Sequence, residues 1–236
     1  MHGSRTRRAW TALALLTLAC ASAPPAPAPG RGTVFGELRL APHPGVTMPS
    51  ANDPSYADPR MRDTRLVDYS RPGFAVVYLE GSPARGERVE LAIRANQFET
   101  RLEPRWLAVA VGGTVSVRNT TEEPHTVSCP SLGTVAKLGP GDAIELAATL
   151  DGPQSVFLLD RPQVESGFFA APGPYAVLTQ SPYFELRDLP PGVVALHAWH
   201  PRLPPLERSV DVVADQSTRV DLVMGVGVAD AEGAAR

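Results

Sequence analysis

The sequence predicts an all-β fold, and three features of composition and pattern support this expectation. The chain of 236 residues contains 25 prolines and 20 glycines, and only 20% of its residues are charged. Such a composition favours many short strands and turns over helices. Apolar runs of strand length recur after residue 32, and none of them has the period of an amphipathic helix. About 200 residues follow the first 31, enough to bury the core of one or two domains.

The first residues have the order of a secretory signal sequence. Three arginines precede an apolar run from 9 to 19, and no acidic residue occurs before Glu37. That run is about half the roughly 20 residues that a membrane-spanning helix needs. A basic start, a short apolar stretch and small residues at its end are typical of export signals. We therefore expect a protein that is exported across the inner membrane of a bacterium.

The end of this segment resembles a bacterial lipobox. Leu16-Thr17-Leu18-Ala19-Cys20 matches it except at Thr17, where that motif has an aliphatic residue. The resemblance implies a lipoprotein-type signal over 1–20, acylation of Cys20, and a place in the periplasm or at the outer membrane, held by a lipid anchor only. Conventional cleavage near Ala21-Ser22-Ala23 is the alternative.

Segments after the signal can be assigned in chain order. Residues 21–31 are rich in proline and alanine and predict an extended tether. A strand is expected over 32–40, a long surface loop over 41–73, a buried strand within 73–81, and a disordered tail over 227–236. Further strands are expected over 88–94, 106–111, 114–118, 143–148, 154–159, 174–178, 183–187, 193–199, 207–213 and 218–224.

Charge and motif content exclude several classes of function. The chain has 22 basic and 25 acidic residues, and removal of the signal with its three arginines leaves 19 basic residues and a net charge of −6. Because nucleic-acid binding needs a basic surface, we expect no nucleic-acid partner. If Cys20 is acylated, Cys129 has no disulfide partner and the core alone must hold the fold. The sequence contains no G-x-S-x-G, H-E-x-x-H or P-loop motif, so we do not expect an enzyme.

Both ends of the chain resemble one known module. Gly32-Thr33-Val34-Phe35-Gly36 and the run from Tyr183 to Gly192, which ends in Pro-Pro-Gly, resemble the carboxypeptidase regulatory-like (transthyretin-like) module. In the expected hairpin, Pro191 presets φ and Gly192 supplies a positive φ. The resemblance implies a discontinuous module over 32–82 and 179–226.

A second resemblance covers the middle of the chain. The run from Leu107 to Asn119, followed by His125, and the later Trp199-His200 pair resemble the cupredoxin-like domain of methylamine-utilisation-type periplasmic proteins. This implies a cupredoxin-like Greek-key sandwich over 83–178, inserted in or packed on a transthyretin-like sandwich.

The copper ligands that this resemblance implies are incomplete. A mononuclear blue-copper site needs two imidazoles and a thiolate. His125 matches the first ligand, whereas the later ligands should come from a Cys-x-x-His-x-x-Met loop between Val156 and Tyr175, and that stretch contains no Cys, His or Met. We therefore expect that the ligand loop is lost and that no cofactor is held. The alternative is a periplasmic copper-binding or electron-transfer protein with a non-standard site at His125 and Cys129, completed by Glu122 or Glu123.

These observations favour an exported, non-catalytic envelope protein that binds or scaffolds another protein or a glycan. Aromatic residues in expected loops are candidate anchors for a partner, with local packing as the alternative for each. They are Tyr56, Tyr69, Phe168, Phe169 and Tyr175.

Overall fold

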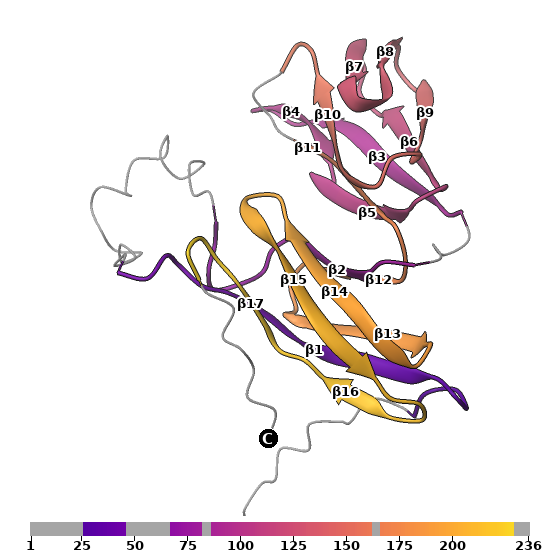
Figure 1. The fold of residues 1–236 in the computed structure, drawn as a ribbon. Helices are drawn as coiled ribbons and strands as arrows, with labels where there is room; N and C mark the ends of the chain where they lie inside the picture. Colours follow the sequence, from indigo (N-terminus) through magenta and orange to yellow (C-terminus); the bar gives the residue numbers. More distant parts are fainter. Residues whose placement is uncertain (1–25, 46–66, 82–85, 162–165, 229–236) are drawn as a thin grey trace, which may run out of the picture.

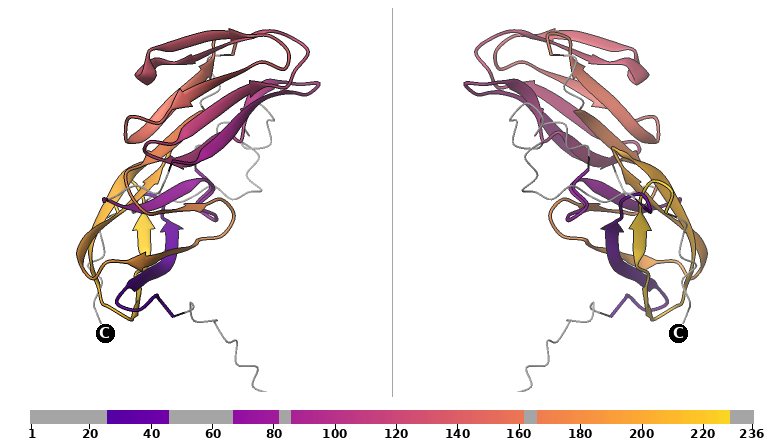
Figure 2. Two further views of the ribbon diagram at one scale, coloured as in Figure 1. Left: turned by 90° about the vertical axis from the view of Figure 1, so that its right-hand side faces the viewer. Right: turned by 90° about the vertical axis from the view of Figure 1, so that its left-hand side faces the viewer.

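The chain forms two bodies of β-strands stacked along the long axis of the molecule (Figures 1 and 2). The computed structural model describes residues 26–45, 67–81, 86–161 and 166–228. In these ranges every regular element is a strand except the short 3-10 helix η2 (Pro130–Leu132). The predicted all-β class is therefore confirmed. None of the described helical residues forms a helix long and apolar enough to span a membrane.

Residues from both ends of the chain build the first body, here called the terminal unit. One of its sheets has the order β13-β1-β16, with β17 also paired to β1, and the other has the order β12-β2-β14-β15. The strands are β1 (Gly32–Leu40), β2 (Ala75–Leu79), β12 (Tyr175–Leu178), β13 (Tyr183–Leu189), β14 (Gly192–His200), β15 (Leu203–Val212), β16 (Ser217–Arg219) and β17 (Leu222–Met224).

The core of the terminal unit joins residues that are far apart in the sequence. Val34 and Leu38 of β1 are fully buried together with Leu196 of β14 and Leu222 of β17. Strand β1 runs parallel to both β16 and β17. A methyl group on Gly36 would lie 1.9 Å from the carbonyl oxygen of Val220, so glycine is required where these strands meet.

The Pro-Pro-Gly segment does not close a hairpin, which corrects the prediction. Strand β13 pairs with β1, whereas β14 pairs with β2 and β15 in the other sheet. Pro190 and Pro191 have no N–H to donate to a ladder, so the chain leaves the first sheet there and enters the second. Gly192 has a φ of +134°, as the sequence predicts.

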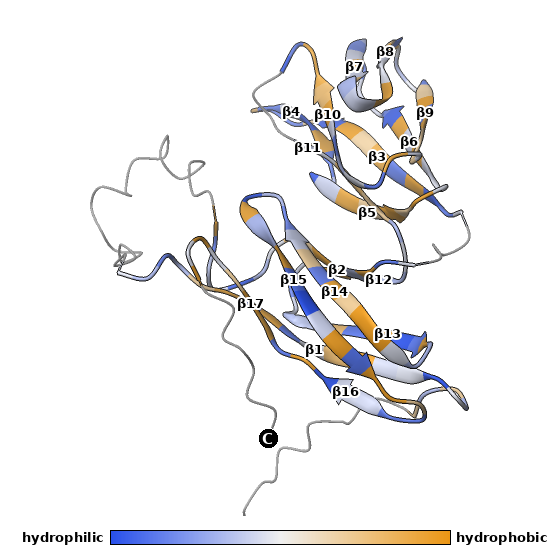
Figure 3. Cartoon of the chain, in the orientation of Figure 1, coloured by the Kyte–Doolittle hydropathy of each residue, from blue (hydrophilic) through white to orange (hydrophobic). Residues whose placement is uncertain are grey.

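The remaining strands form the second body, here called the middle unit. Its two sheets have the orders β5-β11-β10-β7-β8 and β4-β3-β6-β9. Apolar residues lie along β3 and β5 (Figure 3), and they pack into a separate core between the two sheets. The strands are β3 (Arg88–Ala95), β4 (Thr100–Glu103), β5 (Trp106–Ala110), β6 (Thr114–Asn119), β7 (His125–Cys129), β8 (Thr134–Leu138), β9 (Ala143–Ala147), β10 (Gly152–Leu158) and β11 (Ser166–Ala171).

Four strands of the middle unit lie where none was expected, namely β4, β7, β8 and β11. Strand β11 matters most, because Phe168 and Phe169 were expected to be loop residues that contact a partner. Both are instead buried inside the chain, at 0% and 1% exposure. Phe168 faces the core of the middle unit, and Phe169 faces the terminal unit. A strand that is buried on both faces has a continuous apolar run instead of alternating apolar and polar residues. The alternation that identifies half-buried strands is therefore missing from β11, and the sequence did not predict it as a strand.

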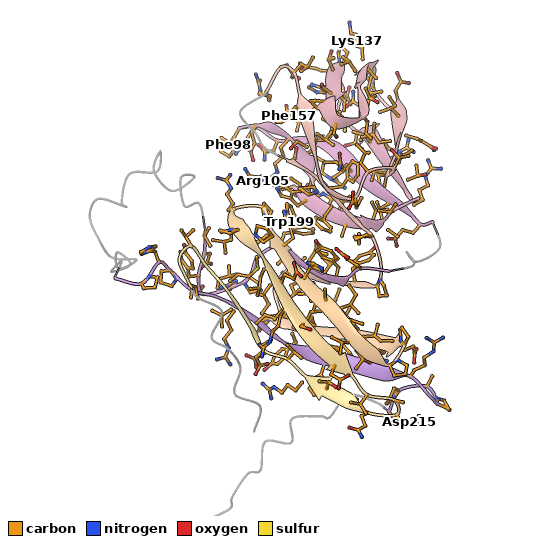
Figure 4. All side chains as sticks on the ribbon, viewed as in Figure 1. Phe98, Arg105, Lys137, Phe157, Trp199 and Asp215 are labelled. Atoms are coloured by element: carbon orange, nitrogen blue, oxygen red, sulfur yellow. The ribbon has the colours of Figure 1, made fainter. Side chains whose placement is uncertain are left out.

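An aromatic junction connects the two units. The ring of Phe169 lies 4.9 Å from that of Trp199 and 5.1 Å from that of Tyr78, and Trp106 meets Trp199 at 5.2 Å, edge to face. Figure 4 shows Trp199 where the two units meet. Rings at these distances and tilts stabilise a contact beyond the area that they bury. The junction therefore fixes the units against one another.

Two expected segment boundaries are corrected. Residues 175–178 belong to the expected middle segment 83–178, but they form β12, which pairs with β2 of the terminal unit. The expected tether extends to residue 31, but its last residues are bound: the backbone N–H groups of Ala28 and Gly30 donate to the carboxylates of Asp188 and Asp215, at 3.0 and 2.7 Å. The expected signal, Cys20, Tyr56 and the last residues of the tail lie outside the described residues.

Candidate functional site

His125 begins strand β7 at the end of the middle unit, and both of its ring nitrogens have partners. Nδ1 lies 3.0 Å from Oδ2 of Asp160, and Nε2 lies 3.0 Å from Oγ1 of Thr121. An ionised carboxylate only accepts hydrogen bonds, so the Nδ1–H donates to Asp160. Nε2 faces the Thr121 hydroxyl, whose oxygen also lies within hydrogen-bond distance of the Asn119 Oδ1 and of the Glu123 carbonyl. The imidazole, only 4% exposed, is thus held between a carboxylate and a hydroxyl.

Asn119, fully buried at the end of β6, fixes the loop that carries Thr121. Its Nδ2 donates to the carbonyl oxygens of Glu123 at 2.7 Å, Leu138 at 3.1 Å and Gly139 at 3.1 Å. Its Oδ1 accepts from the backbone N–H of Thr121 at 3.0 Å and from the Thr121 hydroxyl at 2.8 Å. A carboxamide both donates and accepts, which this position requires. The loop is therefore pre-ordered.

A hollow of about 440 Å³ opens beside His125. It lies between the hairpin β3–β4 and the loop β6–β7. Two of its wall hydroxyls are bonded within the protein, because that of Thr120 donates to the Ile93 carbonyl at 2.6 Å and that of Thr121 to Asn119. The lining residues are Arg94, Ala95, Thr100, Thr120, Thr121, Glu122, Glu123 and His125.

Phe98 projects from the hairpin whose base lines this hollow. Its side chain is 86% exposed, and Figure 4 shows it at the margin of the middle unit. The turn is fixed by Asn96, whose Oδ1 accepts the backbone N–H groups of Phe98 at 2.8 Å and Glu99 at 3.0 Å. Sequence reasoning missed Phe98. An isolated aromatic residue in the polar run Asn96-Gln97-Phe98-Glu99-Thr100 was the signal for it.

His125 and Cys129, the two residues of the alternative metal site, lie at opposite ends of β7. Cys129 ends β7, and its Sγ lies 3.6 Å from the Ser131 hydroxyl. Along an extended strand, His125 and Cys129 are about 13 Å apart, at roughly 3.3 Å per residue. Glu122 and Glu123 do line the hollow with His125, but the two ring nitrogens face Asp160 and Thr121. Within the described ranges no group of three or more His, Cys, Asp or Glu residues is placed to hold a metal ion. The spacing along β7 therefore disfavours the alternative of a joint site at His125 and Cys129, and the absence of a cofactor stays a prediction.

The other expected anchors do not gather at this hollow. Phe168 and Phe169 are buried, as described above. The hydroxyl of Tyr175 donates to the carboxylate of Glu87, and burial, followed by the neighbouring Glu87, raises the pKa of this phenol. Tyr69 packs against the core of the terminal unit and lines a smaller hollow of about 300 Å³ there.

No protein-family model matches the chain, and no curated protein matches it. Among solved structures, part of the chain is similar to a purple cupredoxin from Nitrosopumilus maritimus, with 19% identity, a TM-score of 0.31, and coverage of 35% of this chain and 99% of that one. Another similar structure is the reduced state of an amicyanin mutant, with 21% identity, a TM-score of 0.30, and coverage of 40% of this chain and 97% of that one.

Proposed function

We propose that this chain is an exported, non-catalytic binding protein of a bacterial envelope, in which a cupredoxin-like middle unit has exchanged its copper chemistry for a binding site. The observation that carries the proposal is the contact between Asp160 and His125. His125 stands where the resemblance places the first copper ligand. The segment after β10, from which the other ligands should come, supplies a carboxylate that holds the imidazole.

A type 1 copper ion does not fit the residues present. The site needs a thiolate close to the imidazoles. The one described cysteine lies at the other end of β7, fully buried, and both nitrogens of His125 face protein side chains, Nδ1 that of Asp160 and Nε2 that of Thr121. The donor set at the hollow therefore favours a binding role over electron transfer.

The order carboxylate, imidazole and hydroxyl also occurs in hydrolases, where the hydroxyl is the nucleophile. Here the hydroxyl of Thr121 is surrounded by acceptors of its own loop, since the Asn119 Oδ1 lies at 2.8 Å and the Glu123 carbonyl at 3.0 Å. A hydroxyl has one proton, so a bond to either acceptor removes the bond that would activate it. This competition supports a structural role for Thr121 rather than a catalytic one.

The arrangement at the hollow suits recognition. Binding surfaces rely on a few rigid anchors, and aromatic side chains are frequent among them. Phe98 is such an anchor, because its turn is fixed by Asn96 and the adjacent hollow is shaped by the network of Asn119. In the proposal, a lipid on Cys20 and the tether keep this end of the molecule available to partners in the periplasm.

Site-specific photo-crosslinking in the native host tests the proposal. p-Benzoylphenylalanine replaces Phe98, and the matched control places it at Val135, which is 65% exposed on β8. We expect an adduct of defined mass from position 98 in the envelope fraction and none from position 135. Equal adducts at both positions, or none at either, would contradict a binding role for this end of the middle unit.

A further inference from the structure

We propose that the hollow beside His125 receives the cationic side chain of an arginine or lysine from a partner's peptide segment, while Phe98 packs against a neighbouring part of that segment. This inference rests on the proposed binding function and names the chemistry of the partner. Three observations carry it: the distribution of charge over the middle unit, the hydrogen bonds already made by the neutral polar groups of the hollow, and the exposed ring beside it.

Charges on the outer face of the sheet β4-β3-β6-β9 neutralise one another. Arg88 pairs with Glu145 at 2.6 Å, Arg118 with Glu90 at 3.3 Å, and Arg94 with Glu103 at 3.3 Å. These pairs are at least two-fifths exposed, so each contributes little to stability, but they leave the face without excess charge.

Glu122 and Glu123 differ from the carboxylates of that face. Both are exposed at the rim of the hollow, and among the described residues neither carboxylate has a hydrogen bond or an ion pair. Arg94, the cation of the same wall, directs its Nε to Glu103 instead. The hollow therefore has excess negative charge, which attracts a cation and disfavours an anion.

The neutral groups of the wall do not favour a sugar. A glycan is recognised through hydroxyls and amides that are free to bond with it, but the hydroxyls of Thr120 and Thr121 are bonded to Ile93 and Asn119. Thr100 adds a single further hydroxyl to this wall, whereas Glu122 and Glu123 bring two carboxylates, and a pair of carboxylates suits a guanidinium or ammonium group.

Phe98 adds the second half of the site. Phe98 lies in the turn between Ala95 and Thr100, which line the hollow, and an exposed aromatic ring can pack on an aliphatic side chain or take a cation on its face. Because Asn96 fixes the turn, binding orders little of the backbone, which lowers its entropic cost. A basic peptide that also carries an apolar residue is thus the occupant that matches both features.

Fluorescence anisotropy with two labelled peptides tests the proposal on the mature chain. The first probe is fluorescein-Gly-Arg-Leu-Arg-Gly, and the second replaces both arginines by citrulline, which keeps the shape and removes the charge. We expect the arginine probe to bind at least about tenfold more tightly. The double substitution Glu122→Gln/Glu123→Gln should remove most of this preference, and Phe98→Ala should weaken binding of the arginine probe several-fold.

The control Glu207→Gln/Asp211→Asn removes the same formal charge from exposed positions of β15 in the terminal unit. It should change affinity less than about twofold, because exposed charges beyond a Debye length are largely screened. Val135→Ala is the control for Phe98→Ala.

Three results would overturn the inference: equal binding of both probes, equal loss in the two double variants, or no binding of the arginine probe. Binding of maltotriose that depends on Phe98, without binding of the arginine probe, would assign the hollow to glycans. If crosslinking at position 98 succeeds while the arginine probe fails, the proposed binding function stands and only the chemistry of the partner is wrong.

Discussion

Asn119 shows at the residue scale how one side chain shapes the candidate site. It ends strand β6, and its carboxamide bonds both the loop 120–124 and the β8–β9 turn, so it connects the hollow to the core. Thr121 and Asp160 add the two contacts that hold His125.

Asn119→Asp should destabilise the fold. A carboxylate at this position would face the carbonyl oxygens of Glu123, Leu138 and Gly139 without the two N–H donors that they share, so we expect the free energy of unfolding to fall by about 3 kcal/mol or more. The control is Asn96→Asp, where Oδ1 only accepts and the substitution retains its bonds. Urea unfolding followed by fluorescence measures both variants. Equal, small effects would show that the donated bonds of Asn119 do not contribute.

Copper(II) added to the mature chain should produce no intense thiolate-to-copper absorption in the visible range. The reason is the separation of His125 from Cys129 along β7. Spectra and metal content after removal of excess copper are the measurements, with Cys129→Ser as a control that should match the parent. Stoichiometric copper that is lost in His125→Ala would contradict the expected loss of the site.

At the scale of elements, β11 connects the two units. It lies between β5 and β10 in its sheet, and alternate side chains serve different cores, with Phe168 and Ala170 in the core of the middle unit and Phe169 and Ala171 in the junction. Because the strand is buried on both faces, it tolerates no charged residue. Its apolar run therefore reflects two interfaces rather than an exposed loop.

Phe169→Ala and Phe98→Ala make the same chemical change in opposite environments. Phe169 is 1% exposed and contacts Tyr78 and Trp199, so its loss should lower the free energy of unfolding by about 3–5 kcal/mol. Phe98 is 86% exposed, and its loss should change stability by less than about 0.5 kcal/mol. Thermal and urea unfolding test the pair. A small effect at Phe169 would mean that the junction is not a tight contact.

At the scale of the whole molecule, the middle unit interrupts the terminal unit in the sequence and is stacked on it in space (Figures 1 and 2). Strand β2 precedes the middle unit, β12 follows it, and the two strands pair directly. The chain therefore leaves and re-enters the terminal unit at adjacent points. Tyr175 of β12 and Glu87, which precedes β3, form a hydrogen bond at this crossing, and Glu87 also accepts the N–H of Ala110 at 3.0 Å.

The bond between Tyr175 and Glu87 predicts a loss of stability in alkali. Burial and Glu87 raise the pKa of Tyr175 in the folded state, so the folded chain holds this proton more tightly than the unfolded chain. The stabilisation is fully present below the unfolded pKa of about 10 and is lost as pH rises from there towards the folded pKa. Urea unfolding between pH 8.5 and roughly 11.5 should therefore show a steeper decline for the parent than for Tyr175→Phe. Parallel curves would contradict this coupling.

The sequence by itself determined the all-β class, most strand positions, the positive φ of Gly192 and the absence of Cys, His and Met between Val156 and Tyr175. These properties are local, since they depend on residue type, alternation and composition. Only the tertiary structure decided that β1 pairs with β16 and β17 and that Pro-Pro-Gly joins two sheets. It also decided that β11 is buried on both faces and that Asp160 contacts His125. Pairing between distant strands depends on which faces are buried together, and a single sequence does not record that long-range choice.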